Sequence, residues 1–153
     1  MDSWTKLKRS GVMSRIKSKD TTPEKTVRSL LHSSGYRFRL HKRNLPGTPD
    51  LVFRKHNSVL FINGCFWHQH KNCRNGQMPK SRKFYWEPKL LANVERDKNN
   101  ITELKKNGWK VMVVWECAIN KDSIKAVDQV MFFLNNANKL AGSNQTTLRL
   151  LAK

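Results

Sequence analysis

PDLVFRKHNSVLFINGCFWHQHKNC, residues 49–73, is the stretch from which the architecture of this chain can be worked out. It holds two short apolar runs, residues 51–53 and 59–62, separated by a turn-like Lys-His-Asn. Apolar runs of this length around a polar turn are typical of a β-hairpin. An acid, Asp50, stands at the start of the hairpin, and a segment with cysteines and histidines follows its second strand. The sequence therefore predicts a hairpin that joins a lone acid to a Cys/His loop.

Helices are predicted on both sides of this hairpin. Thr22 can cap a helix that starts at the following proline, and Gly35 ends it. Leucines, valines and isoleucines recur at helical spacing over residues 87–107 and again over about 121–139. These patterns predict one long helix in the middle of the chain and one near its end.

Two further strands complete the predicted sheet. Residues 36–41 alternate as YRFRLH, which predicts a half-buried strand with Tyr36, Phe38 and Leu40 on its apolar face. Residues 109–115, WKVMVVW, predict a buried strand that is parallel to an earlier one if the long helix is a crossover. The order α-β-β-β-α-β-α predicts an α/β fold, a mixed sheet flanked by helices.

The charge of the chain indicates its partner. Among 153 residues, Lys and Arg exceed Asp and Glu by 19, and the pI is about 10.4. Nucleic acid is the polyanion expected to bind such a protein. An anionic membrane surface is the rival, but no basic amphipathic helix stands out, and no apolar run resembles a span or a signal peptide. Plain solubility charge is the third interpretation.

The chain is expected to form one domain with two flanking segments. Residues 1–20 are polar and basic and predict an arm, with a short helix over roughly 11–17, that can reach around a duplex; a disordered tail is the alternative. Residues 21–139 are the expected catalytic domain, and residues 140–153 are expected to form a loosely ordered tail. Three cysteines is a poor match to a secreted disulfide framework, so we expect an intracellular, cytoplasmic protein.

Asp50 is the candidate metal-binding acid. Residues 25–86 contain thirteen Lys or Arg residues and this single carboxylate. An isolated acid in a positive field is expected to stay ionised and to attract a divalent cation, which phosphodiester hydrolysis requires. The alternative is a turn aspartate that pairs with a neighbouring arginine.

The Pro-Asp pair followed by a hairpin is the pattern of the restriction-endonuclease-like PD-(D/E)xK nucleases. Those proteins usually carry an acid and a lysine on the second strand, whereas this strand ends in Phe61-Ile62-Asn63-Gly64. The backbone carbonyl near Ile62 can act as a metal ligand instead. His68 can take or position a proton near neutral pH.

The cysteines fit a structural zinc site. Cys65, His70 and Cys73 lie close together and Cys117 follows the strand at 109–115, which gives the Cys₃His set of a closed tetrahedral site. Unpaired thiols and solvent-facing histidines are the alternative. His68 is then left for catalysis, although His68 and His70 can exchange these roles. The neighbouring Phe66-Trp67 pair either covers the zinc site or wedges between base pairs.

Three motifs, NGCFWHQHKNC, NVERDKNNI and GWKVMVVWECAI, closely resemble the very-short-patch repair (Vsr) DNA mismatch endonucleases, over residues of about 10–119. The resemblance implies a restriction-endonuclease-like fold that nicks one DNA strand 5′ of the thymine in a T·G mismatch. Such mismatches arise when 5-methylcytosine deaminates, which implies a functional link to a DNA cytosine methyltransferase. It further implies Mg²⁺ for catalysis and Zn²⁺ for structure.

The resemblance also implies roles for individual residues, which are carried over by position. Asp50 and the Ile62 carbonyl would bind the catalytic metal, and His68 would be the catalytic histidine. Glu24 and Asp97 fall at acidic positions near the site, with Asp97 able to orient His68. The zinc ligands would be Cys65, His70, Cys73 and Cys117. The residues that insert into DNA would be Met13, Phe66 and Trp67. The family has Thr-His where this chain has Ile62-Asn63, so a second active-site histidine is lost.

The sequence therefore predicts a monomeric, nucleoid-associated, Mg²⁺-dependent and strand-specific mismatch endonuclease that acts on double-stranded DNA and not at membranes. A zinc-stabilised DNA-binding module without catalysis is the alternative from another class. A related nickase or restriction enzyme with another target is the alternative within the same class.

Overall fold

The computed structural model describes residues 10–12 and 14–150, and the side chains as far as residue 136. Met13, the first nine residues and the last three lie outside the described part. Residues 10–12 and 14 are helical. No helix among the described residues is long and apolar enough to cross a membrane.

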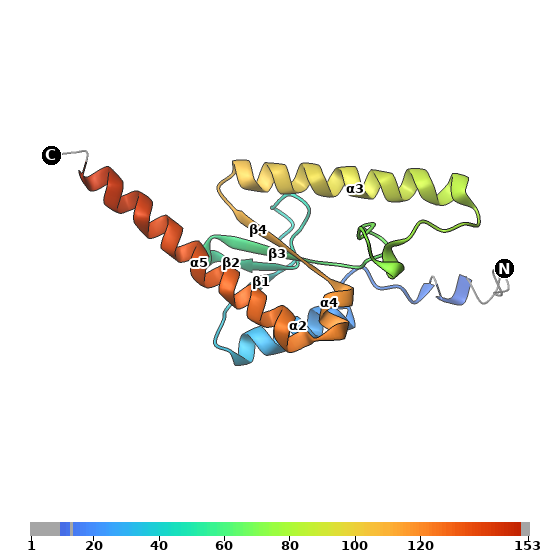
Figure 1. Ribbon diagram of the computed structural model, residues 1–153, viewed down its shortest axis with the longest axis horizontal. Helices are drawn as coiled ribbons and strands as arrows, with labels where there is room; N and C mark the ends of the chain where they lie inside the picture. The colour runs from blue at the N-terminus through green and yellow to red at the C-terminus, as the bar shows by residue number, and fades with distance from the viewer. Residues whose placement is uncertain (1–9, 13, 151–153) are drawn as a thin grey trace.

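A four-stranded mixed sheet forms the centre of the molecule (Figure 1). Its strands are β1 (Arg39–Leu40), β2 (Leu51–Phe53), β3 (Ser58–Asn63) and β4 (Lys110–Trp115), in the order β1-β2-β3-β4. The first two pairings are antiparallel, whereas β3 and β4 are parallel, with Asn63 opposite Trp115. The predicted hairpin and the parallel last strand are thus confirmed.

Helices cover both faces of the sheet. Figure 1 shows α3 (Lys83–Lys106) along one side, and α2 (Thr22–Ser33), α4 (Glu116–Lys121) and α5 (Ser123–Leu150) on the other. Because side chains alternate along a strand, the strands β2, β3 and β4 each supply side chains to both layers. Leu60 and Ile62 pack with α2, α4 and α5, whereas Val59 and Phe61 pack towards Leu104 of α3. This two-sided burial confirms the mixed α/β sheet flanked by helices.

Several predicted boundaries are wrong. Thr21, not Thr22, caps α2. The backbone of Thr21 is extended, its side chain accepts the N–H of Glu24, and Pro23 lies in the first helical turn, where a proline is tolerated. Gly35 ends this helix as predicted, with φ +90°. The strand at 36–41 shrinks to Arg39–Leu40 at the sheet edge, where Leu40 has 43% of its surface exposed.

The helices after the sheet also differ from expectation. The long central helix begins at Lys83, directly after Arg82, whose φ of +52° turns the chain. The short helix α4 was not predicted, because its six residues are too few to show a helical period. The last helix, predicted over about 121–139, extends to Leu150.

Candidate active site and metal centre

The ends of three strands meet at one edge of the sheet. The parallel strands β3 and β4 both end there, at Asn63 and Trp115, and the antiparallel β2 begins there, directly after Asp50. A cavity of about 970 Å³ opens at this edge. Its lining includes acids, two histidines and basic side chains, among them Glu24, Asp50, His41, His68, Asp97, Lys17, Lys19, Arg43 and Arg96. The topology therefore collects the candidate catalytic residues from four separate segments.

Asp50 is held at the mouth of β2 by two groups. Its Oδ2 accepts the backbone N–H of Ile62 at 2.7 Å, and its Oδ1 lies 3.7 Å from Nδ1 of His41. The pKa of Asp50 is raised to about 6, mainly by burial; the charge of Glu24 also raises it, whereas the Ile62 hydrogen bond lowers it. The sequence predicted that surrounding positive charge keeps Asp50 ionised. Burial and the negative charge of Glu24, which lies just before the basic segment 25–86, act against this ionisation.

The carbonyl of Ile62 faces the same side as its N–H. In an antiparallel pair the N–H and C=O of one residue leave the same edge of the strand. The N–H of Ile62 points to Asp50, so its C=O also points towards β2. Continuing the register of Leu51 with Leu60 by two residues places Pro49 opposite Ile62, and proline has no N–H to donate. A carboxylate and a backbone carbonyl thus lie side by side, and oxygen ligands of this kind suit a hard divalent cation such as Mg²⁺.

His68 is paired with Asp97 of α3. Its Nδ1 is hydrogen-bonded to Asp97 Oδ2, and both side chains are about a quarter exposed. Two hydrogen bonds hold the turn that carries His68: its own N–H donates to the Gly64 carbonyl at 3.2 Å, and Asn93 Nδ2 donates to the Trp67 carbonyl at 3.2 Å. The pairing at Nδ1 leaves Nε2 available for proton transfer.

Glu24 lines the cavity but is already bonded to its surroundings. Its side chain is 4% exposed. The carboxylate accepts from the Thr21 hydroxyl, from the backbone N–H of Asp20 and from Arg28 Nη2 at 2.7 Å. These bonds cap α2 and fix the negative charge of Glu24 near Asp50.

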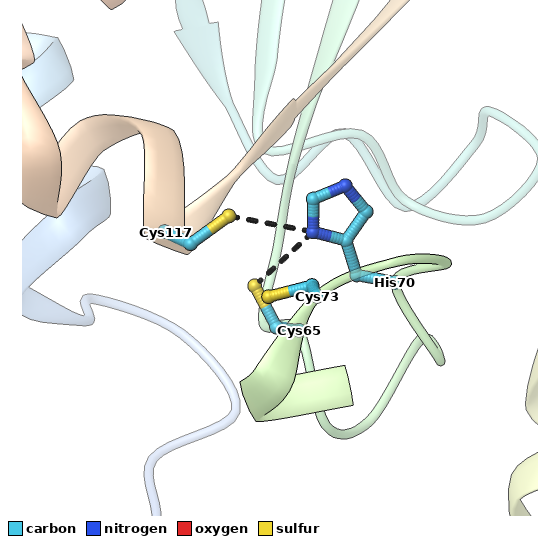
Figure 2. A group of neighbouring side chains, drawn as sticks. All are labelled: Cys65, His70, Cys73 and Cys117. Atoms are coloured by element: carbon cyan, nitrogen blue, oxygen red, sulfur yellow. Dashed lines mark hydrogen bonds between the residues drawn. The ribbon is translucent and has the colours of Figure 1, made fainter. Parts of the chain in front are cut away.

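Four predicted metal ligands form a cluster beside the cavity. The ligand atoms of Cys65, His70, Cys73 and Cys117 all lie within 4.8 Å of one another. Figure 2 shows the three thiols around Nδ1 of His70, which is 3.6 Å from Cys65 Sγ and 3.3 Å from Cys117 Sγ. In a tetrahedral zinc site the sulfur and nitrogen ligand atoms are roughly 3.6–3.8 Å apart, and small side-chain shifts would bring this Cys₃His set to those spacings.

The local backbone explains how the cluster forms. The His70 N–H donates to the Cys65 carbonyl at 2.9 Å, which folds the loop back on itself. The His70 ring stacks on Trp115, with 4.1 Å between centroids and 7° between planes. Burial is the main cause that raises the pKa of the Cys65 thiol, and a bound metal cation would oppose it by replacing the proton.

Phe66 and Trp67 belong to a larger group of aromatic side chains, which we call the aromatic cluster: Phe66, Trp67, Tyr85 and Trp86. Trp86 lies 5.3 Å from Phe66 and 6.0 Å from Trp67 between ring centroids. Lys89 Nζ lies within 6 Å of three of these rings. Trp67 also lines the cavity, so the cluster adjoins the candidate site.

Three residues near the site were missed from the sequence. Trp86 lies one residue before the predicted start of the long helix, and no local pattern links it to Phe66 and Trp67. Arg28 lies four residues after Glu24, a spacing that permits an ion pair on a helix and was a usable signal. His41 gave no signal, because only the pairing of β1 with β2 brings it to Asp50.

Comparisons with known proteins show which family the chain resembles. The family model described as DNA mismatch endonuclease Vsr matches residues 1–75. The chain is 56% identical over 113 residues to the type II nicking enzyme V.XorIIP of Xanthomonas oryzae pv. oryzae, covering 74% of this chain and 82% of the relative. It is 46% identical over 123 residues to the type II nicking enzyme V.NmeAIP of Neisseria meningitidis, covering 80% and 87%. It is 42% identical over 118 residues to the DNA mismatch endonuclease Vsr of Escherichia coli, covering 77% and 75%.

Proposed function

The chain belongs to the Vsr family of DNA mismatch endonucleases and is a nuclease, and from this premise we propose that it nicks one strand of duplex DNA 5′ of the thymine in a T·G mismatch. The observation that carries this proposal is the cavity shared by Asp50 and the His68–Asp97 pair. Two of the relatives are named type II nicking enzymes, which supports cleavage of a single strand. The two-sided mixed sheet supports a restriction-endonuclease-like fold.

Asp50 and the Ile62 carbonyl are the residues that would hold Mg²⁺. The ion, when bound, supplies charge neutralisation at the scissile phosphate and a more acidic water. A cation here also replaces the proton that burial favours on Asp50. Glu24 keeps a second negative charge on the same side of the cavity.

His68 would accept the proton of the attacking water. The hydrogen bond at Nδ1 to Asp97 makes Nε2 the acceptor nitrogen and holds the ring in place. As the water oxygen bonds to phosphorus, its proton passes to Nε2, and the bond from phosphorus to the leaving oxygen breaks. Asp97 then stabilises the imidazolium that forms, as a buried carboxylate does for a catalytic histidine elsewhere.

Phe66 and Trp67 would wedge into the duplex beside the mismatch. A T·G pair is less well stacked than a matched pair, so unstacking costs less there. Met13, in the basic arm, would insert from the other groove. The Cys₃His cluster would hold Zn²⁺ and thereby fix the loop that carries both the wedge and His68.

The setting in the cell follows from this activity. T·G pairs left by deamination of 5-methylcytosine are the proposed substrates, which gives a functional link to a DNA cytosine methyltransferase. We propose a monomer that acts in the cytoplasm on nucleoid DNA.

The test is a nicking assay on duplexes that differ only at one base pair, T·G, C·G or T·A, with each strand labelled in turn. We expect a cut 5′ of the mismatched thymine, with Mg²⁺ and not with EDTA. Asp50→Asn is expected to abolish the cut while duplex binding in EDTA persists.

Two results would refute the proposal. Nicking of all three duplexes at equal rates would indicate a related nickase with another target. Binding without cleavage of any duplex would indicate a zinc-stabilised DNA-binding module.

A further inference from the structure

A chain of polar contacts runs from α2 to the candidate metal-binding acid. Arg28 donates from Nη1 to Asp20 Oδ1 at 2.6 Å and from Nη2 to Glu24 Oε2 at 2.7 Å. The same Nη2 lies 2.8 Å from Nε2 of His41. The other ring nitrogen of His41, Nδ1, lies 3.7 Å from Asp50 Oδ1. His41 therefore stands between a permanent cation and the acid of the cavity.

The contact with Arg28 fixes the tautomer of His41. A guanidinium group has donors and no acceptor, so Nε2 of His41 must be the acceptor of this hydrogen bond. An imidazole that accepts at Nε2 carries its proton at Nδ1. The proton is consequently on the ring nitrogen that lies 3.7 Å from Asp50 Oδ1. At 3.7 Å it orients the carboxylate electrostatically, and a shift of less than 1 Å makes it a hydrogen bond.

The backbone keeps His41 opposite Asp50. The N–H of His41 donates to the Asp50 carbonyl at 3.3 Å, directly beyond the last pair of β1 and β2. His41 also has φ +43°, in the left-handed region that costs free energy for a residue with a side chain. Such a conformation persists only where surrounding contacts enforce it, and here they turn the imidazole between Arg28 and Asp50.

A second metal ion is the competing explanation for this cluster. The ligand atoms of Asp20, Glu24 and His41 lie within 4.8 Å of one another. However, Arg28 already contacts all three, and its side chain is 14% exposed. The positive charge among these three groups is therefore the Arg28 guanidinium. Its influence reaches Asp50 through the His41 imidazole.

We propose that His41 is a positioning residue for Asp50, with Arg28 setting its tautomer. The Ile62 N–H donates to Oδ2 of Asp50 at 2.7 Å, and His41 Nδ1 lies 3.7 Å from Oδ1, so each carboxylate oxygen has a donor nitrogen beside it. Outer partners of this kind orient a metal-binding carboxylate towards its ion. The inference rests on the proposed function, in which Asp50 binds Mg²⁺.

The tautomer is tested by long-range ¹H–¹⁵N NMR of the histidine rings in the full chain without Mg²⁺. The signals of His41 are identified by their loss in His41→Gln. We expect a protonated Nδ1 and an unprotonated Nε2 in the unaltered protein, and a mixture of tautomers in Arg28→Met. A protonated Nε2 in the unaltered protein, or no change in Arg28→Met, would overturn the inference.

The effect on Asp50 is tested by calorimetric titration with Mg²⁺. His41→Leu is expected to weaken Mg²⁺ binding about 10- to 100-fold, as the loss of an outer partner does at other metal sites. His41→Gln is expected to retain most of the affinity, because its amide oxygen can accept from Arg28 and its NH₂ group can donate to Asp50. His32→Leu, at an exposed histidine of α2, is the matched control.

The outcomes separate this inference from the proposed function. Equal Mg²⁺ affinity in His41→Leu and the unaltered protein overturns the positioning role. An equal loss in His41→Leu and His41→Gln, with lowered melting temperatures in both, also overturns it, because a purely structural role is not rescued by hydrogen-bonding groups. If Asp50→Asn binds Mg²⁺ normally, the proposed function fails, whereas the NMR result on His41 remains valid.

Discussion

Cys65 and Cys117 each lie two residues beyond the paired Asn63 and Trp115, at which the parallel strands β3 and β4 end. Residues far apart in the chain therefore reach the same point at the edge of the sheet. His70 and Cys73 approach them from the loop that follows β3 (Figure 2). A metal ion at this point would fasten the loop to β4, and with it the turn that carries Phe66, Trp67 and His68.

Cys117→Ser is expected to remove most of the bound zinc. Because zinc affinity contributes directly to folding free energy, the melting temperature should fall by roughly 5–10 °C, equivalent to a few kcal/mol in a domain of this size. Metal analysis and thermal unfolding measure both effects. Lys121→Ser, at an exposed position of the same short helix, is the control. Unchanged zinc content in Cys117→Ser would exclude this ligand.

Gly76→Ala is expected to disrupt the same cluster without removing a ligand. A Cβ at this position would lie 2.3 Å from the backbone oxygen and 2.8 Å from the backbone nitrogen of His70. Backbone cannot yield as a flexible side chain does, so His70 should shift and zinc affinity should fall. Gly11→Ala, where a Cβ meets nothing within 4 Å, is the control. Equal zinc affinity in the two variants would contradict the prediction.

His68→Ala is expected to slow nicking about 10²- to 10⁴-fold, the usual contribution of a general base. Asp97→Asn should also slow it, because the imidazole loses its orienting carboxylate. Single-turnover nicking at saturating protein measures both rates, and duplex binding in EDTA should change little. His32→Ala is the matched control at an exposed histidine. Normal turnover by His68→Ala would remove this residue from the mechanism.

Mg²⁺ binding is expected to weaken below pH 6. Burial raises the pKa of Asp50 from 3.8 to about 6, so a proton competes with the metal and affinity should fall by up to about tenfold per pH unit below that value. The metal-free fold should show the opposite trend. Because the pKa of Asp50 is higher in the folded than in the unfolded chain, protonation of Asp50 stabilises the folded state. This stabilisation is about 3 kcal/mol, is fully present below pH 3.8 and is lost as the pH rises through 6.

Titration calorimetry between pH 4 and 8 measures how Mg²⁺ affinity depends on pH. Chemical unfolding over the same range measures how the stability of the metal-free fold depends on pH. Asp50→Asn has no proton to exchange at this position and should flatten both. An unaltered protein whose Mg²⁺ affinity is constant from pH 5 to 7 would show that the carboxylate titrates elsewhere or binds no metal.

Trp67→Ala is expected to weaken binding to a T·G duplex by about 1–3 kcal/mol, the range for an aromatic side chain stacked on a base. Phe66→Ala should act in the same direction, and both should reduce DNA bending measured by fluorescence energy transfer. Phe132→Ala is the control, because that side chain is 71% exposed on α5, outside the aromatic cluster. Equal bending by Trp67→Ala and the unaltered protein would favour a role in covering the metal cluster instead.

Local patterns were enough for the hairpin and the parallel last strand, because apolar runs are formed by adjacent residues. They also predicted the grouping of Cys65, His70, Cys73 and Cys117, because Cys65 and Cys117 each follow a predicted strand. They were not enough for the 36–41 strand, where an edge position leaves Leu40 exposed despite the alternation. The separate pairing of His68 with Asp97 and of His70 with the thiols could not be chosen from spacing alone.

The amino-acid order thus carried the fold class, the family and most of the chemistry, since these depend on residue type and short-range period. The packing of distant segments decided the electrostatics of the site. Glu24, Arg28 and His41 surround Asp50 only after α2 and β1 dock beside β2, and burial there moves the pKa of the acid in a direction that counting charges along the chain could not give. Long-range contacts and desolvation are properties of the assembled molecule, and neither has a local signature in the sequence.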